Sequence, residues 1–327
     1  GKAVKIRCSP RYCIRRRIRT PLGNREGWRR LTREPGYLPL RNAGPSEGRE
    51  GMGKDAVPLP KAGVINFLKG DKMAISFFYP GSAGEILQGK VQGRDVLVSF
   101  PVNLYTRVEI FEGRFSGSEV EEYAKSFMFF KNILKRWGVD GGNLCFKINS
   151  KIPKGKGFAS STADLCALYH CLVRYFRRKF DITELVEEAL RIEPTDSIVF
   201  NRATLFDYKN GKYYKILGDY IKFFIYVFEG QEEVDTIKFN LSVKEPLAEV
   251  DDLVPVLVRG IEDKDIRKIS FVSTESIKRN QRRLYYPVLQ EVESMMKKTG
   301  GLGIIGGHSG NFLGIIYDKK LDLDIKI

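Results

Sequence analysis

The segment from Ile152 to Ala163 contains the residue types of a phosphate-binding turn. A predicted strand leads into Gly155 and Gly157, and small hydroxyl residues then begin a predicted helix. Glycine allows backbone amides to approach an anion closely, and the N-terminus of a helix favours that anion. Because the spacing fits neither a Walker loop nor the Rossmann glycine pattern, the segment predicts a phosphate cradle of another kind, the alternative being a turn without a ligand. The predicted cradle consists of Pro153, Lys154, Gly155, Lys156, Gly157, Phe158, Ala159, Ser160 and Ser161.

Two further glycine-containing segments accompany this turn. Residues 80–89, PGSAGEILQG, follow the first predicted strand of the main body, and residues 301–310, GLGIIGGHSG, precede the last predicted strand. The three segments, in this order, resemble the three motifs of the galactokinase, homoserine kinase, mevalonate kinase and phosphomevalonate kinase (GHMP) superfamily. One such motif is moderately specific, whereas three in the order of the superfamily support the resemblance strongly.

Departures from the usual motifs narrow the resemblance. The first motif has Ser82 where many superfamily members have lysine, and residues 193–197, EPTDS, follow the helix after the cradle. Together with residues 68–71, 206–207 and 308–310, these features resemble the L-threonine kinases of the cobalamin pathway, over about residues 64–318. A further stretch usually follows the last motif in that family, whereas this chain stops at Ile327, so we expect a C-terminal piece to be missing.

The resemblance implies both a fold and a reaction. The implied fold is α+β and of the GHMP kinase type, with a ribosomal-S5-like N-terminal half, an α+β C-terminal half, and ATP and substrate between them. The implied reaction uses ATP and Mg²⁺ and moves the γ-phosphoryl group to the hydroxyl of L-threonine. The product, O-phospho-L-threonine, leads to the aminopropanol phosphate linker of cobalamin.

The resemblance also implies roles for single residues. Phosphoryl transfer depends mainly on positioning and charge neutralisation, so the site needs a cradle, a metal and a group near the attacking hydroxyl. Ser161 matches a Mg²⁺ ligand, with a helix N-cap as the alternative, and Glu193 completes the metal shell unless it is a solvated helix end. Asp196 is the candidate carboxylate that faces the substrate hydroxyl. Its alternatives are a turn residue after Pro194 and a group that only orients the substrate.

The first and last motifs supply the candidate substrate contacts. The first motif lies near the phosphate acceptor in the superfamily, so Ser82 and Glu85 are expected to contact the amino acid. His308 and Ser309 in the last motif are expected to contact the substrate or its phosphate. For His308, a hydrogen bond that supports the loop is the alternative.

Apolar periodicity and turn residues predict the elements that position these residues. Ser118, with Glu121 three residues later, resembles a capping box at the start of a helix that Gly138 ends, and Asp181 is expected to cap a later helix. Mixed helices and antiparallel hairpins indicate an α+β fold independently of the resemblance. Helices are predicted at 118–137, 160–176, 181–192 and 287–298, and strands at 73–79, 95–100, 105–111, 144–149, 221–228, 302–305 and 312–317.

The positive charge of the chain is concentrated at its N-terminus. Of a net charge of +15 over 327 residues, residues 1–72 carry +12, from 18 Lys and Arg against 6 Asp and Glu. Because this segment shows no helical or strand periodicity, we expect a basic, disordered extension at residues 1–63. By the resemblance, the body is expected to divide into a GHMP kinase N-terminal, ATP-binding domain at 64–205 and a C-terminal domain at 206–327, which we expect to be truncated.

Hydropathy and cysteine usage limit the class of protein. No apolar run reaches the roughly 20 residues that span a bilayer, so no membrane contact is expected. Five cysteines without Cys-x-x-Cys spacing, and only two histidines, argue against a disulfide framework or a structural zinc site and favour a cytoplasmic location. Cys166 and Cys171 are expected to fill a buried helix face.

Three alternatives to an L-threonine kinase remain open. A kinase of the same fold could act on another small alcohol such as homoserine, because the sequence does not reveal the size of the pocket. A nucleic-acid-binding protein could use the basic extension, although nucleic acid is a disfavoured partner because that segment lacks interleaved aromatic residues. An inactive relative would keep the fold without the activity.

Overall fold

The computed structural model describes five stretches of the chain, namely residues 6–8, 64–69, 72–229, 245–307 and 312–320. The predicted contacts His308 and Ser309, and most of the predicted basic extension, lie outside these stretches. Within the described stretches, no helix combines the length and the apolar character needed to cross a membrane.

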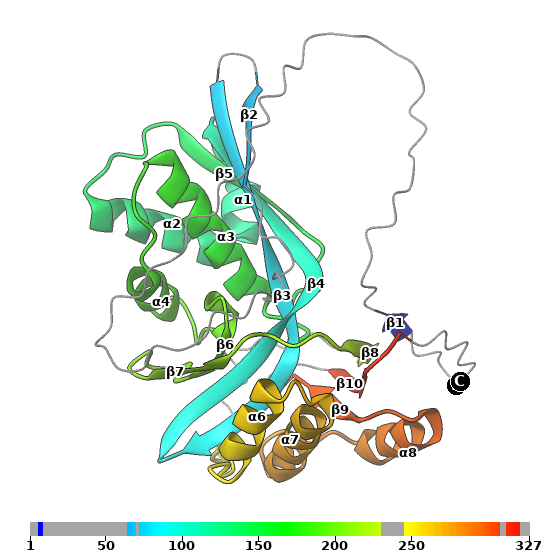
Figure 1. Cartoon of the computed structure of the whole chain (residues 1–327). Helices are drawn as coiled ribbons and strands as arrows, with labels where there is room; N and C mark the ends of the chain where they lie inside the picture. Colours follow the sequence, from blue (N-terminus) through cyan, green and yellow to red (C-terminus); the bar gives the residue numbers. More distant parts are fainter. Residues whose placement is uncertain (1–5, 9–63, 70–71, 230–244, 308–311, 321–327) are drawn as a thin grey trace, which may run out of the picture.

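The described residues form one ten-stranded sheet with helices packed against it (Figure 1). The strand order is β1-β8-β10-β9-β3-β4-β6-β7, while β2 pairs with β3 and β5 with β4 outside this path. The named strands pair in antiparallel fashion, and the predicted α+β class is confirmed. The strands are β1 (Ile6–Cys8), β2 (Val64–Lys69), β3 (Lys72–Val91), β4 (Arg94–Glu112), β5 (Leu144–Ser150), β6 (Ala203–Phe206), β7 (Tyr214–Gly218), β8 (Phe224–Glu229), β9 (Gly303–Gly306) and β10 (Phe312–Tyr317).

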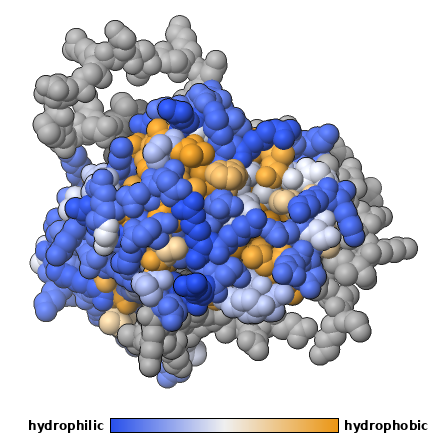
Figure 2. Space-filling model, turned by 90° about the horizontal axis from the view of Figure 1, so that it is seen from below, coloured by the Kyte–Doolittle hydropathy of each residue, from blue (hydrophilic) through white to orange (hydrophobic). Residues whose placement is uncertain are grey.

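The helices cover the sheet in two groups (Figure 1). In the first, α3 packs on β3 and β4, and α2 and α4 pack on α3. In the second, α7 packs on β9 and β3, and α8 packs on β10. The face seen from below is mostly hydrophilic, with separate hydrophobic patches (Figure 2). The helices are α1 (Gly117–Glu122), α2 (Ala124–Trp137), α3 (Ser160–Tyr175), α4 (Ile182–Leu190), α6 (Leu253–Glu262), α7 (Ile266–Arg279) and α8 (Leu289–Thr299), with short 3₁₀ turns η1 (Ser197–Val199) and η2 (Asn280–Arg282).

A long hairpin of β3 and β4 forms the centre of the sheet. Its turn is Gln92-Gly93, where φ is positive at both residues (50° and 74°), as a two-residue hairpin loop requires. The prediction of two separate strands at 95–100 and 105–111 was wrong, because both segments belong to the single strand β4. Pro101 is tolerated because the strand opposite is irregular, with register shifts between Pro80 and Leu87. The first motif therefore lies inside β3 instead of after it.

Local capping residues determine where several helices begin and end. Ser116 caps α1, and the prediction of Ser118 was wrong. The Ser116 hydroxyl accepts a hydrogen bond from the Glu119 amide, while the Glu119 carboxylate accepts one from the Ser116 amide. Ser116 has the extended backbone of an N-cap (φ −83°, ψ 154°), whereas Ser118 already lies in the helix. Asp181 caps α4, and Gly138 ends α2 in the left-handed region, both as predicted.

Two element starts lie later than the apolar pattern predicts. β8 begins at Phe224 instead of Ile221, and α8 begins at Leu289 instead of Pro287. Before β8, Phe223 lies outside the strand and packs against Phe100, with ring centroids 5.8 Å apart. The helices α6 and α7 were not predicted.

The main hydrophobic core lies between the hairpin and α3. Cys166 and Cys171 are fully buried in α3, as predicted. His170 in the same helix stacks between Phe77 and Phe180, with ring centroids 4.2 Å and 4.7 Å away. Burial lowers the pKa of His170 to about 4, so this imidazole is a neutral part of the core.

The described part of the N-terminal extension is the strand β1. It pairs with β8, with Ile6 opposite Phe228. The expectation of a disordered extension at residues 1–63 stays a prediction, because most of these residues lie outside the described stretches. The domain boundaries after residues 63 and 205 stay predictions.

Candidate active site

The turn before α3 has a backbone suited to anion binding. Gly155, Gly157 and Ala159 all have positive φ (64°, 85° and 52°), so left-handed residues recur at every second position. Glycine adopts this conformation freely, whereas the Cβ of Ala159 makes it unfavourable there. Ala159 is also the N-cap of α3, and no side chain caps this helix. The first amides of α3 thus lack a side-chain cap and are available to an anion.

Close backbone contacts join the described parts of the three motifs. The Ser82 amide donates a hydrogen bond to the Phe158 carbonyl at 3.0 Å. A Cβ added at Gly81 would lie 2.6 Å from the Phe158 oxygen, and one added at Gly84 would lie 2.3 Å from the Gly306 oxygen. Only glycine at these two positions lets β3 pass between the cradle and the third motif.

Asp196 is buried between the start of α3 and the central hairpin. Its Oδ2 accepts hydrogen bonds from Ser82 Oγ (3.2 Å) and Ser99 Oγ (3.1 Å). Its backbone amide donates to the hydroxyl of Thr162 in α3 at 3.2 Å. The carboxyl group is therefore fixed by residues of β3 and β4, and its backbone by the helix that follows the cradle.

The Asp196 carboxyl group has a strongly perturbed pKa. Burial raises the pKa to about 7, and the nearby negative charge of Glu85 adds to this, although the hydrogen-bond donors act in the opposite direction. Glu85 is itself buried and lies opposite Ser99 in the hairpin. Asp196 Oδ1 accepts a hydrogen bond from the Ile198 amide at 3.0 Å, so Asp196 also caps η1, as in the predicted alternative of a turn residue.

Glu193 carries a second buried carboxylate, beside α2. Its Oε2 pairs with Lys125 Nζ at 2.5 Å, and the side chain of Glu193 is only 7% exposed against 42% for that of Lys125. Lys154, in the cradle, pairs with Glu122 Oε1 at 3.0 Å. Lys125 and Lys154 are thus both bound to carboxylates.

Asp164 is a third buried acid, on the same helix as Ser161. Burial raises its pKa to about 6; the charge of Glu193 also raises it, whereas the Thr106 hydroxyl and the charge of Lys154 lower it. Its Oδ1 has no hydrogen-bond partner among the described residues.

The residues around the cradle fit a divalent cation such as Mg²⁺. This ion prefers oxygen ligands and is usually held by one or two carboxylates together with substrate phosphates. Glu193, Asp164 and the hydroxyl of Ser161 offer such oxygens, and one of them is without a partner. In the described part of the chain, no group of three or more Asp, Glu, His or Cys residues could hold a metal ion by itself. Phosphate oxygens would therefore have to complete the shell.

The structure adds residues that the sequence did not predict. Ser82 and Asp196, predicted separately, are in direct contact through a hydrogen bond. Thr162 directly follows Ser161 in the cradle motif, so its position was a usable signal. Ser99 became recognisable only through the register of the hairpin, which brings it to the same carboxylate.

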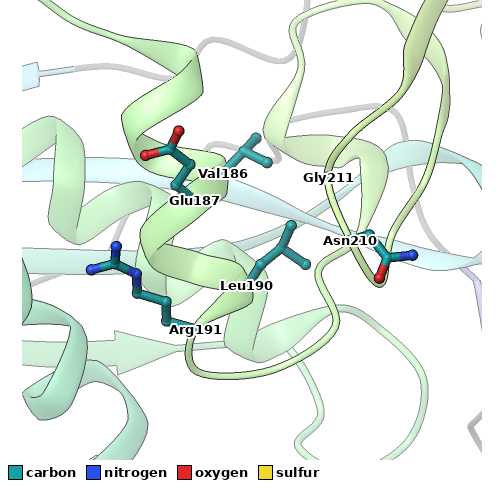
Figure 3. Close-up of a pocket in the computed structure, with 6 residues that line it drawn as sticks. All are labelled: Val186, Glu187, Leu190, Arg191, Asn210 and Gly211. Carbon is teal, nitrogen blue, oxygen red and sulfur yellow. The ribbon is translucent and has the colours of Figure 1, made fainter.

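A shallow pocket away from this site has a different character. It lies beside α4, where Val186 and Leu190 line it together with Glu187, Arg191 and the turn at Asn210 and Gly211 (Figure 3). None of the predicted site residues lines this pocket, so it is separate from the cradle and from Asp196.

Comparisons with known proteins show similarity to GHMP kinases and to L-threonine kinases. Residues 122–201, which include the cradle, Glu193 and Asp196, match the family "GHMP kinases N terminal domain". The L-threonine kinase of Salmonella typhimurium (strain LT2) is 34% identical over 148 residues, which cover 44% of this chain and 48% of that protein. The L-threonine kinase of Citrobacter freundii is 25% identical over 249 residues, covering 74% of this chain and 85% of that protein. The match thus spans about half the length of the first relative.

Solved structures share the fold at low sequence identity. Homoserine kinase from Cytophaga hutchinsonii superposes with a TM-score of 0.58 at 15% identity, over 78% of this chain and 88% of that one. L. major mevalonate kinase superposes with a TM-score of 0.57 at 14% identity, over 78% of this chain and 91% of that one. Streptococcus pneumoniae phosphomevalonate kinase gives 0.57 at 15% identity, over 76% and 92%. The predicted GHMP kinase fold is confirmed.

Proposed function

We propose that this chain, whose residues 122–201 match the GHMP kinases N terminal domain, is an ATP-dependent kinase that phosphorylates the hydroxyl of L-threonine. The observation that supports this most is the buried Asp196 carboxyl group, held by Ser82 and Ser99 next to the start of α3. The similarity to L-threonine kinases supports the choice of acceptor. By the same resemblance, the O-phospho-L-threonine formed is proposed to enter cobalamin assembly.

The nucleotide phosphates are proposed to lie at the N-terminus of α3. The uncapped amides there, and the glycines of the cradle, provide donors without a competing side chain. Ser161 and Glu193 are proposed to hold Mg²⁺, which supplies charge neutralisation for the transferred phosphoryl group when bound. The ion pair of Lys125 with Glu193 keeps this carboxylate in place beforehand.

Asp196 is proposed to accept the proton of the threonine hydroxyl. The hydroxyl oxygen forms a new bond to the γ-phosphorus of ATP, and the bond between this phosphorus and the oxygen bridging it to the β-phosphate breaks, which releases ADP. The hydroxyl proton passes to a carboxylate oxygen of Asp196. A base is most effective when its pKa lies near the working pH, and the pKa of Asp196 is raised to about 7. Ser82 and Ser99 orient the carboxylate for this transfer.

Glu85 is proposed to recognise the ammonium group of the amino acid. Its buried carboxylate lies close enough to Asp196 to raise the pKa of that acid, so a cation between them would be stabilised by both. A hydroxy amino acid such as threonine carries an ammonium group close to its hydroxyl, whereas a simple alcohol lacks the ammonium group. His308 and Ser309 stay proposed contacts to the substrate or its phosphate.

A coupled ADP-release assay tests this function. The full chain would be supplied with ATP, Mg²⁺ and, in turn, L-threonine, L-serine, L-homoserine and no acceptor. Because one methyl group in a fitted pocket is worth about 1–3 kcal/mol, L-threonine should exceed L-serine by about 10- to 200-fold in kcat/KM. Turnover of L-homoserine equal to or faster than that of L-threonine would instead establish a kinase for another small alcohol.

A further inference from the structure

Asp164 is a buried acid for which the proposed function gives no role. It lies near the start of α3 and is 5% exposed. Within the described residues it forms no ion pair, and its Oδ1 has no hydrogen-bond partner. A buried carboxylate without compensation is costly, and such groups normally have a cation or a donor beside them. The missing partner therefore needs an explanation.

The position of Asp164 relates it to the cradle. It follows Ser161 by three residues, so the two side chains lie on the same face of α3. Thr106 of β4 is close enough for its hydroxyl to lower the pKa of Asp164, yet its Oγ1 also lacks a partner with hydrogen-bond geometry. The two groups thus lie close together, yet neither oxygen atom has a partner at full hydrogen-bond geometry, as expected where a polar ligand belongs.

The lysines around this part of the site compensate Asp164 only in part, because the charge of Lys154 lowers its pKa but no ion pair forms with it among the described residues. Lys125 is bound to Glu193 at 2.5 Å, and Lys154 is bound to Glu122 at 3.0 Å. Glu193 is near enough that its negative charge raises the pKa of Asp164. Two buried carboxylates thus lie within electrostatic range of each other, with only one of them in an ion pair.

We propose that Asp164 joins Glu193 and Ser161 as an oxygen ligand of the divalent cation that accompanies the nucleotide phosphates. Two carboxylates and one hydroxyl, completed by phosphate and water oxygens, form the kind of shell in which Mg²⁺ and Mn²⁺ are held. The proposal rests only on the nucleotide-binding part of the proposed function. It does not depend on which alcohol is phosphorylated.

Binding of Mn²⁺ in the presence of ADP, followed by electron paramagnetic resonance, tests this proposal without any turnover. Asp164→Asn keeps the size of the side chain and removes its charge. The Mn²⁺ affinity should fall by about 10- to 100-fold. In the presence of a chelator, ADP alone should bind to Asp164→Asn at least as tightly as it binds to the wild type. The reason is that the substitution removes a negative charge near the phosphates. Substitution of a purely structural residue would not lower the affinity for Mn²⁺ while leaving the affinity for ADP alone intact.

Glu188→Gln is a matched control. Glu188 is fully buried, and its Oε2 also lacks a partner, but Arg136 and Arg191 already neutralise it at 3.0 Å and 2.9 Å. This variant should keep the wild-type Mn²⁺ affinity. Asp164→Ser provides a second, smaller variant and should lose Mn²⁺ affinity to the same extent as Asp164→Asn.

Two results would overturn the proposal. One is wild-type Mn²⁺ affinity in folded Asp164→Asn or Asp164→Ser, as judged by cooperative thermal unfolding. The other is an equal loss in Glu188→Gln. Failure of the wild type itself to bind Mn²⁺ with ADP would contradict the proposed kinase function instead, so the two failures are distinguishable.

Discussion

Two sides of the start of α3 carry buried acids in different surroundings. On one side, the Asp196 carboxylate receives three hydrogen bonds, from two serine hydroxyls and one backbone amide. On the other side, Glu193 is paired with a lysine and Asp164 has an oxygen without a partner. Neutral donors orient an acid and leave it able to accept a proton, whereas an uncompensated acid attracts a cation. Two buried aspartates, Asp196 and Asp164, are thus suited to different chemistry by their surroundings.

Helix geometry keeps these two sides apart. Thr162, which binds the Asp196 backbone, and Asp164 are two residues apart in α3. Successive residues of an α-helix differ by about 100° around its axis, so these two side chains point to nearly opposite sides. Substitutions on the two sides should therefore separate catalysis from binding of the metal nucleotide.

The largest effect is expected at Asp196. Asp196→Asn keeps the size of the side chain and removes its charge, so the rate constant for transfer should fall by about 10²- to 10⁴-fold while ATP binding changes little. Single-turnover kinetics at saturating L-threonine would measure this. Nearly full turnover would make Asp196 a turn residue only, with catalysis left to the cradle and the metal.

A smaller, opposite pattern is expected on the metal side. Glu193→Gln should weaken binding of magnesium nucleotide by about 10- to 100-fold and affect the transfer step less. Ser161→Ala should act in the same direction, because it removes an oxygen ligand from the same shell. Titration calorimetry with ADP, with and without Mg²⁺, would measure both variants. Equal binding with and without the metal in the wild type would argue against a metal site here.

The pH dependence of stability should sharpen the contrast further. In the folded protein the pKa of Asp196 is about 7, above the ordinary value of 3.8. The protonated acid thus favours folding at low pH, and this contribution is lost as the pH rises from about 4 through 7. Asp196→Asn stays neutral throughout, so its melting temperature relative to the wild type should rise by several degrees between pH 5 and pH 8. A constant difference across this range would contradict the raised pKa.

The smallest effect is expected from the N-terminal extension. Deletion of residues 1–63 removes β1, but β8 keeps its pairing with β10. We expect turnover to be unchanged and stability to fall by less than about 1 kcal/mol, because β1 has only three residues and apolar burial scales with the area involved. Thermal unfolding of the shortened chain would measure this. Loss of a cooperative transition would show that the extension is structural.

Much of the fold around the cradle could be predicted from local signals. The periodic apolar residues of α3, the Asp181 cap and the Gly138 stop act within a few residues of the chain. The course of β3 through the first motif could not be predicted in this way. It depends on irregular pairing with β4, which is a property of the hairpin and not of either strand alone.

The candidate site was predictable in its residue types and less so in its contacts. The cradle and Asp196 follow from motifs whose residues are adjacent in sequence. The Ser99 contact joins residues 97 positions apart, and the burial of Asp164 depends on the packing of α3 against β4. Such partners become visible only when the elements are assembled.

A crystal structure of the full chain with Mg²⁺, a non-hydrolysable ATP analogue and L-threonine would test the central claim most directly. We expect phosphates at the N-terminus of α3, the cation on Glu193 and Ser161, and the threonine hydroxyl within hydrogen-bond distance of the Asp196 carboxylate. Phosphates bound elsewhere, or a threonine hydroxyl turned away from Asp196, would contradict the proposed function.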